Sequence, residues 1–150
     1  MFINRSSKGI FNSLGMLSIL LIACLIKENK AGCLNCLIPQ ELEPYQVYYL
    51  YNPDYPQNSV DEEHNYEWDL GAPENYHVFL NCTLNLPNDP DNCFHHKVIV
   101  QTNLSKPPVP HCGNKKFTAV SATNKMKLFY QMLYRGEEGN FACSVMATPH

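Results

Sequence analysis

An alternation of apolar and polar residues predicts a series of short β-strands along most of this chain. It is clearest over residues 76–84, where every second side chain, from Tyr76 to Leu84, is apolar. Strands are predicted at residues 46–51, 66–70, 76–84, 97–102, 117–120, 125–133 and 141–146. Turns rich in Pro, Asn, Asp and Gly separate them, and this region has no amphipathic helical pattern. The pattern therefore predicts an all-β antiparallel sandwich.

The first 32 residues have a different pattern, which is typical of an export signal. A basic start with Arg5 and Lys8 precedes an apolar run at residues 14–26, and small residues follow at Ala31 and Gly32. The run has 13 residues, whereas a helix needs about 20 to cross a bilayer. We therefore expect a cleaved signal peptide and a secreted, extracellular protein. An uncleaved signal anchor is the alternative.

Removal of the signal changes the cysteine count from seven to six, because Cys24 leaves with it. An even number of cysteines in an exported chain indicates disulfides. Cys82 and Cys143 lie on the apolar faces of their strands, so both can point into one core. Cys93 and Cys112 lie at strand edges, where a bridge can tie two loops. We predict the pairs Cys82–Cys143 and Cys93–Cys112, although six cysteines allow fifteen pairing patterns.

Two N-glycosylation sequons agree with export. They begin at Asn81 and Asn103. Asn81 precedes an inward-facing cysteine, so the alternation of the strand directs its side chain outward, where a glycan fits. We therefore expect a secreted glycoprotein.

The charge of the mature chain is divided between its two halves. Residues 31–96 contain eleven Asp and Glu and no Lys or Arg, whereas residues 97–150 contain seven Lys and Arg and two Glu. The resulting net charge of −6 argues against nucleic acid and anionic membranes, because both attract basic surfaces. An acidic half can recruit Ca²⁺ or a basic protein. The alternative is a solvated surface that keeps the protein soluble.

Tyrosines are concentrated at the start of the acidic half, at Tyr45, Tyr48, Tyr49, Tyr51 and Tyr55. Aromatic side chains are enriched at recognition surfaces. The alternative is that half of them face the core, as alternate residues of a strand do. We expect the acidic, tyrosine-rich part of the chain to carry the binding surface.

Several short motifs occur in an order that is typical of one family of extracellular domains. Residues 51–56 are similar to its "SPNYP" turn, Trp68 to its "CxW" strand, residues 111–113 to its "CG" element and residues 139–141 to its closing "GF" strand. From about Tyr48 to Met146 the chain thus resembles the CUB domain. Residues 80–82 and 141–143 are similar to CUB modules of secreted arthropod proteins, many of which precede a trypsin-like protease domain. The resemblance implies a jelly-roll-type sandwich for protein or glycan recognition, and it supports both predicted disulfides.

The chain departs from the family at its first disulfide. The family uses the Cys of "CxW", where this chain has Tyr66, and the usual partner would lie near Cys33 or Cys36. We expect Cys33 and Cys36 to bond to each other, and a bond to another chain stays open. A redox role for this CxxC is the alternative, although no βαβ unit surrounds it.

A second departure concerns calcium. A subset of CUB domains binds Ca²⁺ through a Glu before the third strand, an Asp three residues after its Cys, and a later Asp. Here His96 stands at the second position, and residues 121–124 provide oxygens but no carboxylate. Asp61, Glu62 and Glu63 are not at matching positions. We therefore expect this site to be lost and the protein to have no cofactor.

The remaining metal candidates are His95, His96 and His111. A bond between Cys93 and Cys112 would bring them close together, and grouped imidazoles bind Zn²⁺ or Cu²⁺. Exposed loop histidines without a ligand are the alternative.

The sequence has no recognisable catalytic motif. It lacks a Gly-Asp-Ser-Gly loop for serine-protease chemistry and a Gly-rich phosphate-binding loop, and its mature cysteines are expected to be oxidised. We therefore expect the protein not to be an enzyme.

These observations lead to one favoured function and two alternatives. We expect a signal peptide at residues 1–32, an extension at 33–45, a CUB-like domain at 46–147 and a tail at 148–150. The favoured function is non-catalytic binding of another extracellular protein or a glycan, with no nucleic-acid partner and no membrane after signal cleavage. The first alternative is a truncated N-terminal module of a CUB–trypsin-like serine protease, because the chain stops where such a module joins its linker. A protease inhibitor is less favoured, because no reactive-site loop is recognisable.

Overall fold

The computed structural model describes residues 36–59, 63–87, 93–133 and 138–149, which belong to one compact unit, Gly32–His150. The strands are β1 (Cys36–Glu41), β2 (Val47–Tyr51), β3 (His64–Gly71), β4 (Tyr76–Asn85), β5 (His96–Gln101), β6 (Val109–His111), β7 (Asn114–Val120), β8 (Lys125–Met132) and β9 (Asn140–Pro149). Within these ranges we find no helix with the length and apolar character needed to cross a membrane. The predicted signal peptide, Cys24 and Cys33 lie outside the described residues.

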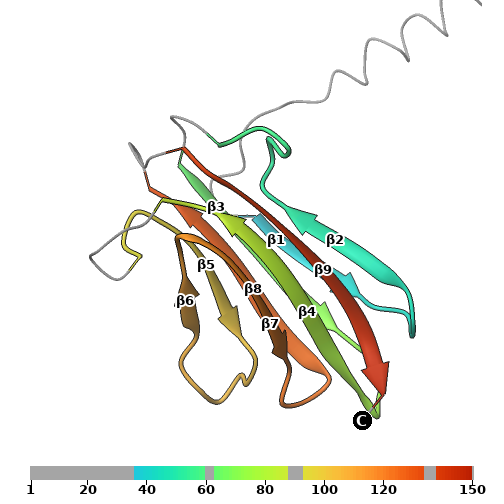
Figure 1. Ribbon diagram of the computed structural model, residues 1–150. Helices are drawn as coiled ribbons and strands as arrows, with labels where there is room; N and C mark the ends of the chain where they lie inside the picture. The colour runs from blue at the N-terminus through green and yellow to red at the C-terminus, as the bar shows by residue number, and fades with distance from the viewer. Residues whose placement is uncertain (1–35, 60–62, 88–92, 134–137, 150) are drawn as a thin grey trace, which may run out of the picture. The chain divides into compact units, whose positions relative to one another are not determined.

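The strands form two sheets that stack face to face (Figure 1). One sheet has five strands in the order β1-β3-β8-β5-β6, and the other has four in the order β2-β9-β4-β7. Neighbouring strands are antiparallel except for β1 and β3, which are parallel. The predicted all-β sandwich with disulfides is therefore confirmed.

The core lies between the sheets and follows the alternation of the sequence. Val78, Leu80 and Leu84 of β4 are fully buried, and so are Leu128 and Tyr130 of β8 in the facing sheet. Each such side chain stabilises the fold by roughly 1.5–3 kcal/mol through the removal of apolar surface from water. The faces predicted for the strands at residues 76–84 and 125–133 are thus confirmed.

The structure extends the sandwich at both ends of the region predicted for the domain. The expected extension at residues 33–45 contains β1, and the expected tail at 148–150 contains the end of β9, where Pro149 pairs with Tyr76. β6 was also not predicted. Both β1 and β6 are edge strands that contain a proline, so they lack the regular alternation on which the prediction depended.

Two disulfides fix this frame. Cys82 and Cys143 are directly paired residues of β4 and β9, and their bond lies in the core with the Cα atoms 4.0 Å apart. Cys93, just before β5, bonds to Cys112, which lies between β6 and β7. Cys36 is also disulfide-bonded. The structure thus contains both bridges that the sequence analysis proposed.

Candidate functional site

The tyrosine-rich segment forms an edge of the four-stranded sheet. β2 pairs with β9 on one side, and among the described strands none pairs with its other side. The side chains of β2 alternate: Tyr48 and Leu50 pack toward the core, whereas Tyr49 and Tyr51 are exposed on the outer face. The alternative that half of the tyrosines face the core is therefore correct for Tyr48 alone among the five.

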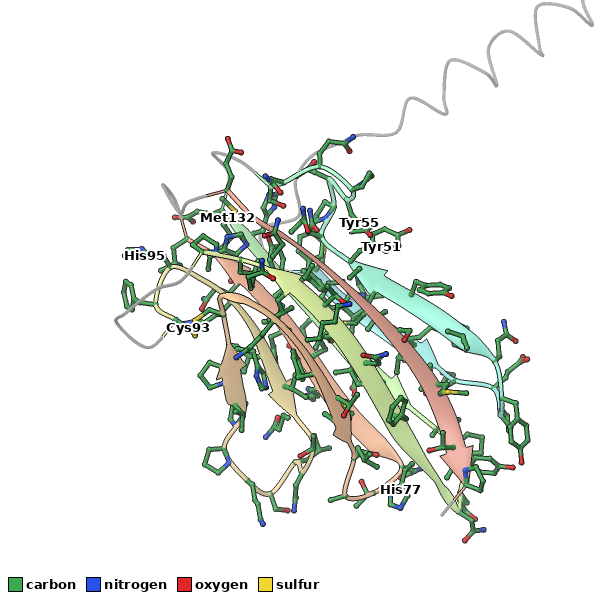
Figure 2. The ribbon with its side chains drawn as sticks, in the orientation of Figure 1. Tyr51, Tyr55, His77, Cys93, His95 and Met132 are labelled. Carbon is green, nitrogen blue, oxygen red and sulfur yellow. A yellow bond between two sulfur atoms is a disulfide. The ribbon has the colours of Figure 1, made fainter. Side chains whose placement is uncertain are left out.

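We call Tyr49, Tyr51 and Tyr55 the tyrosine face. Tyr49 is 70% exposed, Tyr51 49% and Tyr55 44%. The rings of Tyr51 and Tyr55 stack with their centroids 5.5 Å apart, and Figure 2 shows both residues at the same end of β2. Exposed, pre-arranged aromatic rings provide a large contact area with little loss of side-chain freedom on binding.

A hollow of about 270 Å³ follows the free edge of β2 and opens between the two sheets; we call it the edge hollow. It is lined by Ile38, Tyr49, Leu50, Tyr51, Pro53, Tyr66 and Trp68. Trp68 is buried and stacks on Tyr66 at 5.9 Å and against Phe141 at 6.0 Å, so the inner wall of the hollow is continuous with the core. Such a wall is rigid and apolar, which suits an inserted side chain.

A buried asparagine holds the loop that carries Tyr55. The Asn52 amide donates hydrogen bonds to the Gln57 carbonyl and to Ser59 Oγ, each at 3.2 Å, and its Oδ1 accepts one from the Phe141 amide at 3.1 Å. Asn52 is fully buried, so these bonds are shielded from water. They fix residues 52–59 against the start of β9 and thereby position Tyr55.

The other end of β2 carries a second exposed aromatic group. Tyr45 is 70% exposed and has a φ of 64°, a backbone conformation that residues other than glycine and asparagine rarely adopt. Its ring meets that of Tyr76 edge to face at 6.3 Å, and a hydrogen bond between the two hydroxyl groups raises the pKa of Tyr76. Tyr45 is thus held at the surface by a specific contact.

Negative charge flanks the tyrosine face. Glu41 and Glu43 precede β2 and Asp54 follows it, and all three side chains are exposed. Residues 31–96 contain no Lys or Arg. Lys127 of β8 binds Glu67 at 2.5 Å on the outer face of the other sheet. The edge of β2 therefore lies in an acidic environment.

The predicted metal candidates do not form one site. His96 is buried, and its Nε2 lies 2.9 Å from the hydroxyl of Tyr130, whose pKa burial raises to about 12. His111 stacks on Phe117 with the ring centroids 4.0 Å apart. The pKa of His111 is lowered, mainly by burial and to a smaller extent by the positive charge of Lys115. His95 is exposed. Among the described residues no group of three or more His, Cys, Asp or Glu is placed to hold a metal ion.

The positions that the resemblance assigned to calcium are also separated. His96 begins β5 and pairs with Met132, whereas residues 121–124 precede Lys125 at the other end of β8. Ala122 there donates to the carbonyl of Thr102, which follows β5. The two segments thus lie at opposite ends of the sandwich, because β5 and β8 run antiparallel. The expected loss of the calcium site stays a prediction. Asp61 and Glu62 lie outside the described residues.

The two sequon asparagines lie on the surface side of the sandwich. Asn81 is exposed on the outer face of β4, between Thr118 and Ser144. Asn103 lies in the turn after β5, where its Oδ1 accepts a hydrogen bond from the Ser105 amide. Glycosylation at both positions stays a prediction.

Comparison with known proteins gives a match to the fold. No protein-family model and no curated sequence matches the chain. Among solved structures, the CUB1-EGF-CUB2 domains of rat MASP-1 match 75% of this chain with a TM-score of 0.64 and 14% identity. The extracellular region of zebrafish Gpr126/Adgrg6 matches 77% with a TM-score of 0.60 and 17% identity. The MASP-1 CUB2 domain bound to Ca²⁺ matches 76% with a TM-score of 0.58 and 19% identity.

The lengths of the matches differ. The match covers 99% of the MASP-1 CUB2 domain, but only 43% of the rat MASP-1 fragment and 15% of the zebrafish protein. The chain thus matches only part of the length of the rat MASP-1 fragment and of the zebrafish protein. The similarity to arthropod protease modules, and the alternative of a truncated protease, stay predictions. At identities of 14–19%, the matches identify the architecture: the described part of this chain has the fold of a CUB domain.

Proposed function

We propose that this protein is a secreted, non-catalytic CUB-fold module that binds another extracellular protein through the tyrosine face. The single observation that carries the proposal is the exposure of Tyr49, Tyr51 and Tyr55 beside the edge hollow. Outward-facing tyrosines on an edge strand add little to folding, whereas aromatic side chains dominate the binding energy of many protein interfaces.

Secretion is supported by the chemistry of the cysteines. The bonds Cys82–Cys143 and Cys93–Cys112, together with a disulfide-bonded Cys36, suit an oxidising compartment. The structural match to the extracellular region of zebrafish Gpr126/Adgrg6 supports the same location.

The test uses the full chain expressed in a secretory cell and recovered from the medium. Purified ectodomains are screened by biolayer interferometry against the wild type and against the double variant Tyr49→Ser/Tyr51→Ser. We expect at least one ectodomain to bind the wild type and to bind the double variant at least tenfold more weakly. Val120→Ser is the matched control, because Val120 is 51% exposed on the outer face of β7 at the far edge of the same sheet. Equal binding by the wild type and the double variant would place the binding surface elsewhere.

A further inference from the structure

We propose that the free edge of β2 receives an extended, basic segment of the partner as an additional strand of the four-stranded sheet. The inference rests on the proposed function and adds to it the conformation and the charge of the segment that is recognised. It follows from a difference between β2 and the three other sheet edges.

The other three edges carry residues that discourage pairing with a further strand. β1 contains Pro39 and β6 contains Pro110, and β7 contains Lys115 and Lys116. Proline removes a backbone donor, and charged lysines oppose edge-to-edge association. β2 is the outer strand of its sheet, yet its sequence, Val-Tyr-Tyr-Leu-Tyr, contains neither proline nor charge. Its edge is therefore chemically open to a partner strand.

The edge hollow is placed to accept side chains from such a strand. A strand added to β2 would lie about 4.8 Å from it and alternate its side chains between the two faces of the sheet. The inward-facing side chains would enter the hollow against Ile38, Tyr66 and Trp68. The outward-facing ones would lie beside Tyr49 and Tyr51. Backbone hydrogen bonds would then provide affinity, and the hollow would select apolar residues at alternate positions.

The charges around β2 favour a basic segment. Exposed Glu43 lies before the strand and exposed Asp54 after it, so both ends of an added strand would meet negative charge. Arginine side chains on the outward-facing positions would contact both these carboxylates and the faces of the tyrosine rings. The occupant with the best complementarity is therefore an extended segment that alternates arginine or lysine with apolar residues.

The same charges disfavour a second copy of this chain as the occupant. In a two-fold pairing of β2 with β2, the antiparallel arrangement would place Glu43 of one copy beside Asp54 of the other. Like charges in register oppose association. A heterologous basic strand avoids this repulsion.

The test uses the full secreted chain and a fluorescein-labelled synthetic peptide of seven residues that alternates arginine and valine. Fluorescence anisotropy measures its affinity. One control peptide replaces every arginine with glutamate, and another keeps the side chains but carries N-methyl groups on alternate amides. Tyr49→Lys places a positive charge on the edge, and Val120→Lys places the same charge at the far edge of the sheet as the matched control.

We expect the arginine–valine peptide to bind with micromolar affinity and both control peptides to bind at least tenfold more weakly. Tyr49→Lys should weaken binding at least fivefold, whereas Val120→Lys should leave it unchanged. Amide exchange at residues 47–51 should slow when the peptide is bound. Equal affinity of the N-methylated peptide, equal affinity of the glutamate peptide, absence of peptide binding, or a dimer of the free protein in sedimentation would each overturn the inference. Because the ectodomain screen does not use these peptides, a partner that still depends on Tyr49 and Tyr51 would leave the proposed function intact.

Discussion

The two edge strands of the four-stranded sheet, β2 and β7, flank the same pair of central strands and yet present opposite chemistry. β7 points Phe117 and Ala119 toward the core and exposes Lys115 and Lys116. β2 points Tyr48 and Leu50 inward in the same way, but exposes two uncharged tyrosines. The residues at the centre of each inward face are thus equivalent, and the two strands differ in the side chains that they expose.

This difference distinguishes the residues that each strand needs to join the sheet from those that are available for binding. Both strands bury one apolar face, which is sufficient for each to join the sheet. Exposed tyrosines contribute little to stability at such positions, and they leave an edge that other chains can extend. A sequence selected only for a stable, soluble sandwich has no need of them, whereas the lysines of β7 keep that edge closed. The contrast favours recognition at β2.

The largest expected effect concerns the disulfide that joins β4 and β9, the two central strands between β2 and β7. Replacing Cys82 and Cys143 with alanine removes a bond that closes 61 residues, and the chain-entropy model predicts a loss of about 4 kcal/mol in the free energy of unfolding. The matched variant without Cys93 and Cys112, which are 19 residues apart, should lose about 3 kcal/mol. Urea unfolding followed by the fluorescence of Trp68, the only tryptophan, measures both. The reverse order would mean that strain or local packing outweighs chain entropy.

The next effect distinguishes the loops beside the two edges. Asn52→Ala removes the bonds to Gln57 and Ser59 and leaves the buried Phe141 amide without its partner, which should cost about 2 kcal/mol of unfolding free energy. The exposed Asn114 begins β7, and Asn114→Ala should change stability by less than about 0.5 kcal/mol. The same unfolding measurement compares them. Similar small losses would show that the loop is held by other contacts.

The free energy of unfolding is expected to fall in acid because of His111, which stacks on Phe117 of β7. Burial and Lys115 lower the pKa of His111, so the folded protein resists protonation of this ring while the unfolded chain accepts a proton near its ordinary value of about 6.5. The stability that depends on neutral His111 is therefore complete above about pH 6.5 and declines as the pH falls through the lowered pKa.

His111→Phe keeps an aromatic ring against Phe117 and removes the titration. Unfolding free energies measured between pH 8 and pH 5 should fall more steeply for the wild type than for this variant. Parallel profiles would mean that protonation of His111 does not distinguish the folded from the unfolded state.

The clearest sequence signals, over residues 76–84 and 125–133, belong to β4 and β8, which have one fully buried face. β4 and β8 alternate because each lies inside a sheet, with one face on the core, so local periodicity records their environment. The same alternation placed Cys82 and Cys143 in the core. Edge strand β1 left no such signal: Pro39 interrupts it, and its partner β3 lies more than twenty residues further along the chain. Pairing over that distance depends on the assembled sheet.

The candidate site was predictable in composition but not in geometry. The alternation of the strand separated Tyr48 from Tyr49 and Tyr51, but the sequence did not show which of the two faces turns inward or that Asn52 holds the loop after β2. A linear motif also does not specify which ends of antiparallel strands meet, so the sequence did not show how far His96 lies from residues 121–124. An asparagine before a proline suggests only a turn. The burial of Asn52 depends on Phe141 at the start of β9, which is far away in the chain.

The smallest expected change in stability gives the sharpest test of the comparison between the two edges. Tyr49→Lys gives β2 the chemistry of β7, and Lys116→Tyr does the opposite on an outward position of β7. Because both side chains are exposed, each variant should keep its unfolding free energy within about 0.5 kcal/mol of the wild type. Lys116→Tyr should increase concentration-dependent self-association in sedimentation velocity, since it removes a charge that protects an edge, whereas Tyr49→Lys should not. If Tyr49→Lys instead lowered the unfolding free energy by more than about 1 kcal/mol, Tyr49 would be part of the fold, and the exposed tyrosines of β2 would no longer indicate a binding edge.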